Sequence, residues 1–324
     1  MGKFGFFRNG DDVPDKHRSV MKPKIGIALG SGVARGWAHL GVLKRLGELG
    51  YEPDIVAGTS MGALIGGCYA AGTLRQLEAF ALGLTRRRVF GLLDLTLSGS
   101  GLIAGTKLTN LLNKHLGHLK IEDLEKEFVG IATELATGHE IWLRQGPLVE
   151  AMQASYALPG ILKPVNVGGV WLMDGALVNP IPVSVCRAMG ARLVIAVNLN
   201  TDAFGAGTVI QNSGVNDEED AEAANDTDSS FAATLKQRFF GRNSNPDPGI
   251  SDIMMAAFNI SQDRLARSRL AGDPPDVMIT PRAGQIGIFD FDKAQESIEI
   301  GRDAVDKTLP YLEEAVEVLK RHAQ

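Results

Sequence analysis

The chain has 324 residues, of which 44% are hydrophobic, and a formal net charge of −5 at pH 7. The apolar fraction is enough for a large core, and the acidic balance argues against nucleic acid as a partner. The two cysteines, Cys68 and Cys186, have no metal-ligand or redox spacing. We therefore expect no disulfide, no metal site and a reducing, cytoplasmic compartment.

No uncharged apolar run reaches the ~20 residues that a transmembrane helix needs. We expect a soluble protein, or one bound peripherally at the inner membrane surface. Residues 1–22 have the composition of a flexible leader. Its phenylalanines at positions 4, 6 and 7 are candidates for membrane contact, although a frayed terminus is the simpler interpretation. We assign residues 23–324 to one domain.

The ordered part begins with strand and helix patterns in alternation. An apolar run over 24–29 predicts a buried strand, and apolar residues at three-residue spacing over 37–49 predict a helix. A second short strand is expected over 54–57. This alternation predicts a mainly parallel sheet covered by helices, and therefore an α/β fold.

The rest of the chain continues this alternation. Helices are expected over 73–116 (interrupted near 98–101), 148–156, 182–189, 250–271 and 292–321, and strands over 129–135, 140–143, 170–173, 193–197 and 276–279. Residues 203–230 are densely acidic and lack apolar anchors, which indicates a disordered insertion. Residues 250–324 then form a C-terminal helical part.

The helix predicted over 250–271 places Ile250, Met254, Phe258 and Leu265 on one face. Packing in the core is the more frequent explanation of such a face. A lipid-docking surface, with arginines nearby, is the alternative.

The most informative segment is Gly58-Thr59-Ser60-Met61-Gly62, between the second strand and a helix of small residues. A serine on a sharp strand-to-helix turn points its hydroxyl out of the fold, at a helix N-terminus that favours negative charge. Gly58 and Gly62 leave room for the tight backbone and the close approach of the helix. This pattern predicts that Ser60 is a nucleophile. A Gly-rich turn that merely contains a serine is the alternative.

A second Gly-rich turn, from Gly30 to Gly36, joins the first strand to the first helix. It lacks the Gly-Lys-Ser/Thr of a P-loop, and Arg35 stands where a dinucleotide-binding turn has its third glycine, which makes nucleotide binding a weak alternative. Such a turn can also form an oxyanion hole, in which backbone N–H groups stabilise a tetrahedral acyl intermediate. For Arg35 we consider an anchor for the loop, a salt bridge and a contact with an anionic head group.

A serine nucleophile needs a base, and the sequence argues against histidine. A hydrolase triad in the order Ser, acid, His needs a late histidine, and only His322 follows residue 140, close to the C-terminus. Asp174 ends an apolar strand and precedes Gly175, so its carboxylate can emerge at the sheet edge. In a dry pocket this carboxylate gains basicity and can take the Ser60 proton. A turn-capping Asp-Gly pair is the alternative.

Two further features complete the candidate site. The segment over residues 154–159 is interpreted as pocket wall and helix end. His39 lies on the helix behind the Gly-rich turn, and packing is the more frequent role for such a histidine.

The Gly-rich loop, the Gly-Thr-Ser-Met-Gly turn and the Asp-Gly-Ala strand end together resemble the patatin-like phospholipases. The closest resemblance is to the bacterial members related to neuropathy target esterase, and it covers most of residues 24–200. It implies a three-layer α/β/α fold and hydrolysis of fatty-acyl esters by a Ser–Asp dyad. In this chain the dyad positions are Ser60 and Asp174.

The resemblance also places the oxyanion donors at Gly32 and Val33. The family's run of three glycines is Ser31-Gly32-Val33 here. Backbone N–H donors survive that change, but Val33 must adopt dihedral angles that suit glycine better.

We therefore expect a serine acyl-ester hydrolase of the phospholipase A or lysophospholipase type, with a lipid or fatty-acyl ester as substrate and no metal or organic cofactor. An acyltransferase or thioesterase with the same dyad is an alternative, because acceptors other than water can resolve an acyl-enzyme. A lipid-binding regulatory module with little turnover is a third.

Overall fold

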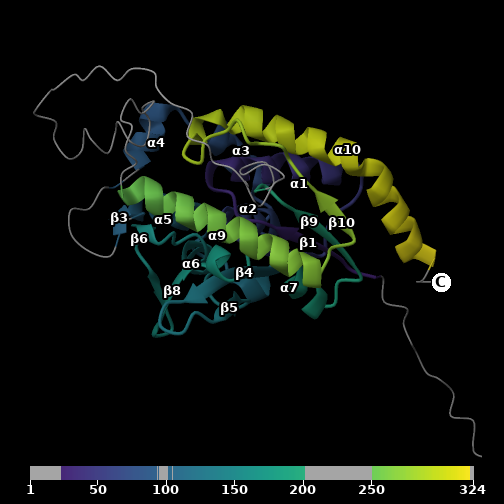
Figure 1. The fold of residues 1–324 in the computed structure, drawn as a ribbon, viewed down its shortest axis with the longest axis horizontal. Helices are drawn as coiled ribbons and strands as arrows, with labels where there is room; N and C mark the ends of the chain where they lie inside the picture. The colour runs from purple at the N-terminus through teal and green to yellow at the C-terminus, as the bar shows by residue number, and fades with distance from the viewer. Residues whose placement is uncertain (1–22, 93, 95–100, 104, 201–249, 322–324) are drawn as a thin grey trace, which may run out of the picture.

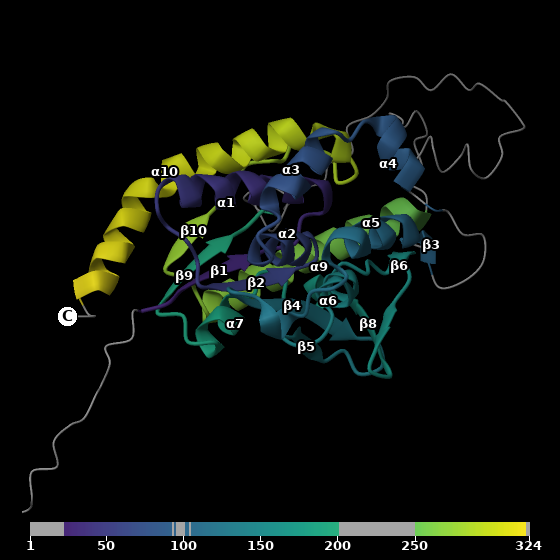
Figure 2. The ribbon, with the colours of Figure 1, turned by 180° about the vertical axis from the view of Figure 1, so that it is seen from behind.

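The computed structural model describes residues 23–92, 94, 101–103, 105–200 and 250–321. The predicted leader (1–22) and acidic insertion (203–230) lie outside these residues. The described residues form a central sheet with helices on both faces, as Figure 1 and, from behind, Figure 2 show. This is the three-layer α/β/α arrangement that the sequence predicts.

The main part of the sheet is parallel and has the order β10–β9–β1–β2–β4. Its strands are β1 (Ile25–Leu29), β2 (Ile55–Thr59), β4 (Glu127–Glu134), β9 (Leu193–Val197) and β10 (Val277–Ile279). Successive residues of these strands enter opposite halves of the core. Ile27, Leu29 and Val56 pack on one face of the sheet, and Ala28 and Ile55 pack on the other.

One end of the sheet is antiparallel, which the sequence did not predict. Strand β5 (Glu140–Leu143) pairs with β4, and β8 (Val170–Asp174) pairs with the opposite edge of β4. Strand β7 (Val165–Val167) continues the sheet beyond β8. A separate small sheet joins β3 (Gly101–Ile103) to β6 (Gly160–Leu162).

Helices cover the two faces unequally. The larger layer holds α1 (Ala38–Glu48), α2 (Met61–Ala70), α3 (Leu74–Leu82), α4 (Arg86–Leu92), α5 (Thr106–Leu116), α6 (Leu148–Ser155) and α10 (Ala294–Arg321). The smaller layer holds α7 (Val183–Ala188) and α9 (Ile250–Gly272). Helices α1 and α10 cross closely, because Gly41 and Gly301 stand where a Cβ atom would collide with the backbone of the facing helix.

The predicted apolar face of α9 is buried only in part. Phe258 and Leu265 are half-buried, and Phe258 packs beside Met255, while Met254 is 53% exposed. The structure also buries Gln262 and Ala266, which lie about one residue round the helix from the predicted face. Among the described residues, no helix combines the length and the apolar character needed to cross a membrane.

Candidate active site

Ser60 lies on a sharp turn between β2 and α2. Its backbone has φ 57° and ψ −121°, and Ser60 and Val33 are the non-glycine residues with positive φ in the described parts of the chain. A β-carbon at Gly62 would collide with the Leu29 carbonyl, and one at Gly58 would collide with the Gly62 backbone. The two glycines therefore permit the tight turn that the sequence predicts.

The pairing of β4 brings Ser60 and Asp174 together. Strand β2 runs parallel to β4 and ends with Thr59 opposite Ile131. Strand β8 runs antiparallel to β4 and ends with Asp174 opposite Ala132, the next residue of β4. The two strands therefore meet end to end along one edge of β4, which places residues 114 positions apart in the sequence side by side.

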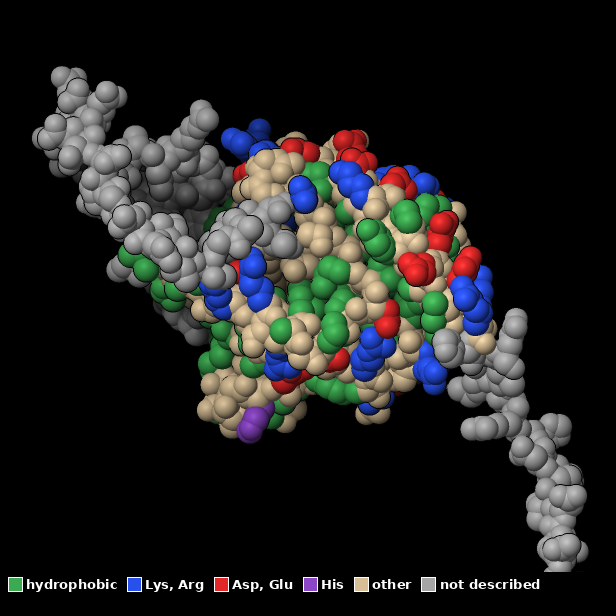
Figure 3. All heavy atoms as spheres, turned by 45° about the vertical axis from the view of Figure 1, so that its right-hand side comes forward, with side chains coloured by type: hydrophobic (Ala, Val, Ile, Leu, Met, Phe, Trp, Pro, Cys, Tyr) green, Lys and Arg blue, Asp and Glu red, His purple; other side chains and the backbone are tan. Residues whose placement is uncertain are grey.

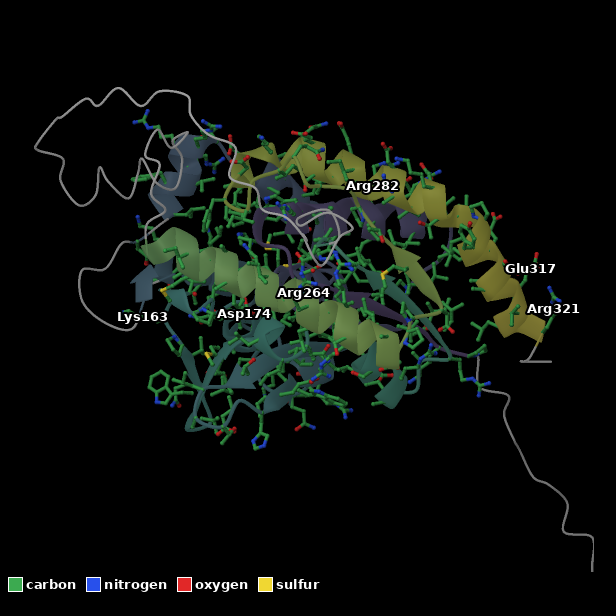
Figure 4. All side chains as sticks on the ribbon, viewed as in Figure 1. Lys163, Asp174, Arg264, Arg282, Glu317 and Arg321 are labelled. Atoms are coloured by element: carbon green, nitrogen blue, oxygen red, sulfur yellow. The ribbon has the colours of Figure 1, made fainter. Side chains whose placement is uncertain are left out.

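The Ser60 hydroxyl donates a hydrogen bond of 2.6 Å to Asp174 Oδ2. The other carboxylate oxygen accepts the backbone N–H of Ala176 at 2.8 Å. Asp174 is 1% exposed, and Figure 4 shows it within the body of the fold, whereas Glu317 and Arg321 project at the margin. A β-carbon at Gly175 would collide with the Ile131 carbonyl, so the turn after Asp174 requires glycine.

Burial raises the pKa of Asp174 to about 7, against the opposing effect of its hydrogen bonds from Ser60 and Ala176. Burial disfavours the charged carboxylate, and so makes it a stronger base. A general base works best when its pKa lies near the operating pH. The environment thus gives Asp174 the basicity that an aspartate in water lacks.

The Gly-rich loop lies beside Ser60, because Val33 and Ser60 line the same cavity. The N–H groups of Gly30, Ser31 and Ala34 bond to backbone carbonyls at 3.0–3.1 Å. Those of Gly32 and Val33 have no acceptor among the residues that the structure describes. Val33 has φ 49°, a strained angle for a β-branched residue. Strain of this kind persists where the surrounding structure enforces it.

Arg35 and Gly36 hold this loop in place. Arg35 Nε donates to the Ile286 carbonyl at 2.8 Å, a contact of the kind that anchors a loop. Ser297 donates to the Arg35 carbonyl at 3.2 Å. A β-carbon at Gly36 would collide with the Met61 side chain. The loop is thereby tied to the C-terminal part of the chain and to the helix that follows Ser60.

His39 supports the loop from behind and is fully buried. Its Nε2 lies 2.7 Å from the Gly30 carbonyl, which can only accept, so Nε2 carries the proton. Burial lowers the pKa of His39 to about 4, and the imidazole is neutral at pH 7. His39 therefore packs in the core, as expected, and also bonds to the Gly30 carbonyl, a contact that the sequence did not reveal.

Ser155 makes contacts at this site that the sequence does not reveal. Its hydroxyl donates to the Ile131 carbonyl at 2.5 Å and accepts the N–H of Ser60 at 3.0 Å. It thereby ties the turn at Ser60 to β4. The local sequence indicates only pocket wall here, because nothing in it shows which backbone atoms the Ser155 hydroxyl meets.

A cavity of about 470 Å³ opens at Ser60 and Asp174. Its wall is almost entirely apolar and is supplied by α2, α3, α4 and α5 and by the segments near residues 156–162 and 289–291. Met61, Leu64 and Cys68 line it from one face of α2, and Thr73 lines it beyond the end of that helix. The cavity therefore follows α2 away from Ser60.

The described residues contain no cluster of three or more His, Cys, Asp or Glu side chains that could hold a metal ion. Figure 3 shows acidic and basic side chains interspersed over the visible face, without the gathering of Lys and Arg that nucleic acid needs. The arrangement suits acyl transfer through serine: a hydroxyl, a buried carboxylate, an apolar cavity, and N–H groups that have no acceptor among the described residues.

Comparison with known proteins gives the family. The model of the patatin-like phospholipase family matches residues 27–187. An uncharacterized NTE family protein of Mycobacterium tuberculosis is 32% identical over 91% of this chain and 94% of its own length. The lysophospholipase NTE1 of Phaeosphaeria nodorum is 28% identical over 88% of this chain, which spans 18% of that longer protein.

Among solved structures, VipD from Legionella pneumophila aligns with 91% of this chain and 67% of its own, with a TM-score of 0.46 and 13% identity. The family relation depends on the sequence matches, which cover the Gly-rich loop, the Ser60 turn and Asp174. The chain therefore belongs to the NTE family of patatin-like phospholipases, a family of lipid ester hydrolases.

Proposed function

We propose that the protein hydrolyses acyl esters of the phospholipid or lysophospholipid type, with Ser60 as nucleophile and Asp174 as general base and acid. The observation that carries this proposal is the 2.6 Å hydrogen bond between the two side chains at the opening of an apolar cavity. This distance lies within the range that proton transfer requires. The raised pKa of Asp174 supports the same roles.

The reaction has two halves. Ser60 Oγ attacks the ester carbonyl carbon while its proton passes to Asp174, and the proton then goes to the leaving alkoxide as the C–O bond breaks. In the second half, water attacks the acyl-enzyme and gives one proton to Asp174. That proton returns to Ser60 as the fatty acid leaves.

The free N–H groups of Gly32 and Val33 are the proposed oxyanion donors. Each lacks an acceptor among the described residues, and Val33 lines the same cavity as Ser60 and Asp174. Removing one oxyanion donor in other enzymes typically costs about 3 kcal/mol of transition-state stabilisation. The strained φ of Val33 is consistent with a loop held in a conformation that serves the reaction.

The cavity fits the acyl chain of a membrane lipid. Helix α2 has 10 residues and therefore extends about 15 Å, at 1.5 Å per residue. One leaflet of a bilayer has a hydrocarbon depth of about 15 Å, half of the ~30 Å core. A cavity that follows α2 from Ser60 to Thr73 thus accommodates one chain along its length, with the ester at the dyad.

A fluorophosphonate probe tests the nucleophile. We expect the wild-type protein to be labelled and to hydrolyse esters in a panel of phospholipids and lysophospholipids, and the Ser60→Ala variant to do neither. Ser184→Ala, a serine outside the cavity lining, serves as the matched control and should be labelled like the wild type. Labelling that persists in Ser60→Ala would refute the assignment.

Peripheral contact with an anionic lipid surface is part of the same proposal. Figures 1 and 2 show α4, α5, β3, β6 and the start of α9 at one end of the molecule, where walls of the cavity also lie. Exposed there are the apolar Ile253 (54%) and Met254 (53%) and the basic Arg87 and Lys163. Apolar side chains among basic ones suit an anionic bilayer. We call these four residues the docking end.

Cosedimentation with anionic vesicles tests the docking end. The Ile253→Asp/Met254→Asp variant should bind roughly tenfold more weakly, because each change removes an apolar side chain from the lipid and adds repulsion. Tyr311→Asp/Leu135→Asp places the same charges at exposed apolar positions elsewhere and should bind as wild type does. Equal loss in both variants would mean that net charge alone governs binding.

A further inference from the structure

A hydrogen bond between two buried side chains joins the Gly-rich loop to α9. The Ser31 hydroxyl donates to Oε1 of Gln262 at 2.6 Å, across 231 positions of the sequence. Nδ2 of Asn200 donates to the same hydroxyl at 3.3 Å, which leaves the Ser31 proton for Gln262. Ser31 is 2% exposed and Gln262 is 5% exposed, so the bond between them is shielded from water.

The stability of the fold does not require this pair to be polar. Gln262 shares the buried positions of α9 with Met255 and Ala266. A methionine at position 262 facing an alanine at position 31 would fill about the same space without a polar partner. Replacing both members of a buried hydrogen-bonded pair by apolar groups of the same shape is nearly neutral for stability. The place of the pair beside the proposed oxyanion donors gives it another use.

Ser31 directly precedes Gly32 and Val33, whose N–H groups are the proposed donors. After them, the Ala34 N–H holds the loop through a backbone carbonyl at 3.1 Å. Before them, the Ser31 N–H bonds to another backbone carbonyl at 3.0 Å, and the Ser31 side chain bonds to Gln262. The loop is therefore fixed on both sides of the two N–H groups that have no acceptor among the described residues.

The backbone between these fixed points is strained. Val33 has φ 49°, and such a conformation persists only where the structure around it leaves no alternative. If Ser31 loses its side-chain contact, Gly32 offers a flexible point at which the backbone can relax. Relaxation there would turn the two N–H groups, and an oxyanion donor works only when its direction is fixed in advance.

We propose that Gln262 is a positioning residue for the reaction: by holding Ser31, it keeps the N–H groups of Gly32 and Val33 directed at the oxyanion that forms on the acyl carbon bound to Ser60. The inference rests on the proposed function, because it takes Ser60 as the nucleophile and these N–H groups as donors. Gln262 does not line the cavity. Its effect therefore falls on the transition state rather than on substrate binding.

Gln262→Met tests this role, because methionine has nearly the shape of glutamine but accepts hydrogen bonds only weakly. We expect kcat for ester hydrolysis to fall about tenfold, less than the ~10²-fold or greater cost of losing an oxyanion donor outright, with KM little changed. Affinity for an alkyl trifluoromethyl ketone, whose adduct with Ser60 carries an oxyanion, should fall by a similar factor. Gln262→Glu keeps an oxygen that can accept the Ser31 proton and should recover most of the rate.

A double variant separates positioning from packing. Ser31→Ala/Gln262→Met replaces the pair by apolar side chains, so its melting temperature should lie near that of the wild type and above those of the two single variants. Its kcat should nevertheless remain about tenfold low, no lower than in either single variant, because both changes remove the same contact. Asn259→Leu, which alters a half-buried amide one turn earlier in α9, is the matched control and should keep wild-type kcat and inhibitor affinity.

The outcomes distinguish this inference from the proposed function. Wild-type kcat and inhibitor affinity in Gln262→Met, or a kcat that recovers together with the melting temperature in the double variant, would overturn the inference and leave the proposed function in place. A wild-type protein that hydrolyses no ester would overturn both.

Discussion

Replacement of Asp174 by asparagine is expected to lower kcat/KM for ester hydrolysis by about 10³-fold, within the usual range for loss of a general base. Asparagine has nearly the same shape and can still accept a hydrogen bond from Ser60, but it cannot take the proton. The wild-type rate should rise with pH to a plateau, with a midpoint near the pKa of about 7 that burial gives Asp174. The residual rate of Asp174→Asn should lack this midpoint.

The same substitution should stabilise the protein at high pH. The pKa of Asp174 rises from 3.8 to about 7 on folding, so the folded state binds more protons between these values and loses stability as pH increases. The loss in the free energy of unfolding is complete above pH 7 and amounts to roughly 4 kcal/mol at most, which corresponds to about three pKa units. Asparagine does not titrate, so the variant does not lose this stability.

Chemical denaturation at pH 5 and pH 8, together with initial rates, would measure both effects. We expect the free energy of unfolding of Asp174→Asn, relative to that of the wild type, to increase from pH 5 to pH 8. Over the same range, the activity of the variant relative to that of the wild type should fall. Asp306→Asn, a surface carboxylate paired with Arg45, is the control and should change neither. Activity near that of the wild type in Asp174→Asn would remove the aspartate from the mechanism.

Replacement of Ser155 by alanine should have the second large effect. Ser155 is fully buried, and its loss leaves the Ser60 N–H and the Ile131 carbonyl without their partner. Each unsatisfied buried group costs about 1–3 kcal/mol, so we expect a loss of roughly 3 kcal/mol in the free energy of unfolding. Because the turn at Ser60 is strained, losing this tie should also misplace the hydroxyl and reduce kcat about 100-fold.

We expect Ser155 to affect the rate by positioning Ser60, so the measurement must separate this effect from the loss of stability. The rate of fluorophosphonate labelling, taken at a temperature where the variant is fully folded, reports the reactivity of Ser60 alone. We expect labelling to slow in Ser155→Ala, KM to change little, and Ser155→Cys to recover part of the rate. A destabilised variant that is labelled at the wild-type rate would show that Ser155 has only a structural role.

Local sequence patterns predicted the elements whose conformation depends mainly on neighbouring residues, such as buried strands and tight turns. The apolar run of β9 gave its bounds without error, because a strand buried on both faces reads as a continuous apolar segment. The glycines around Ser60 predicted the turn, because few other residues permit such a backbone.

Other features depend on contacts between distant segments. The direction of β8 and its pairing with β4 cannot be read from either strand alone. The hydrogen bonds of Ser155 and His39 are made with backbone atoms that only the fold brings near. The buried face of α9 was predicted only in part, because its apolar side chains form no single periodic stripe and several rotations of the helix fit the sequence about equally well.

The end-to-end meeting of β2 and β8 along β4 has an evolutionary consequence. Adjacent residues of β4 fix the distance between the Ser60 and Asp174 side chains. The intervening hundred residues need only leave β2 at its end and return at the end of β8. Those residues include most of the cavity wall. Insertions, deletions and exchanges there can remodel the cavity without moving Ser60 relative to Asp174, so members of the family are free to diverge in the lipids that they accept.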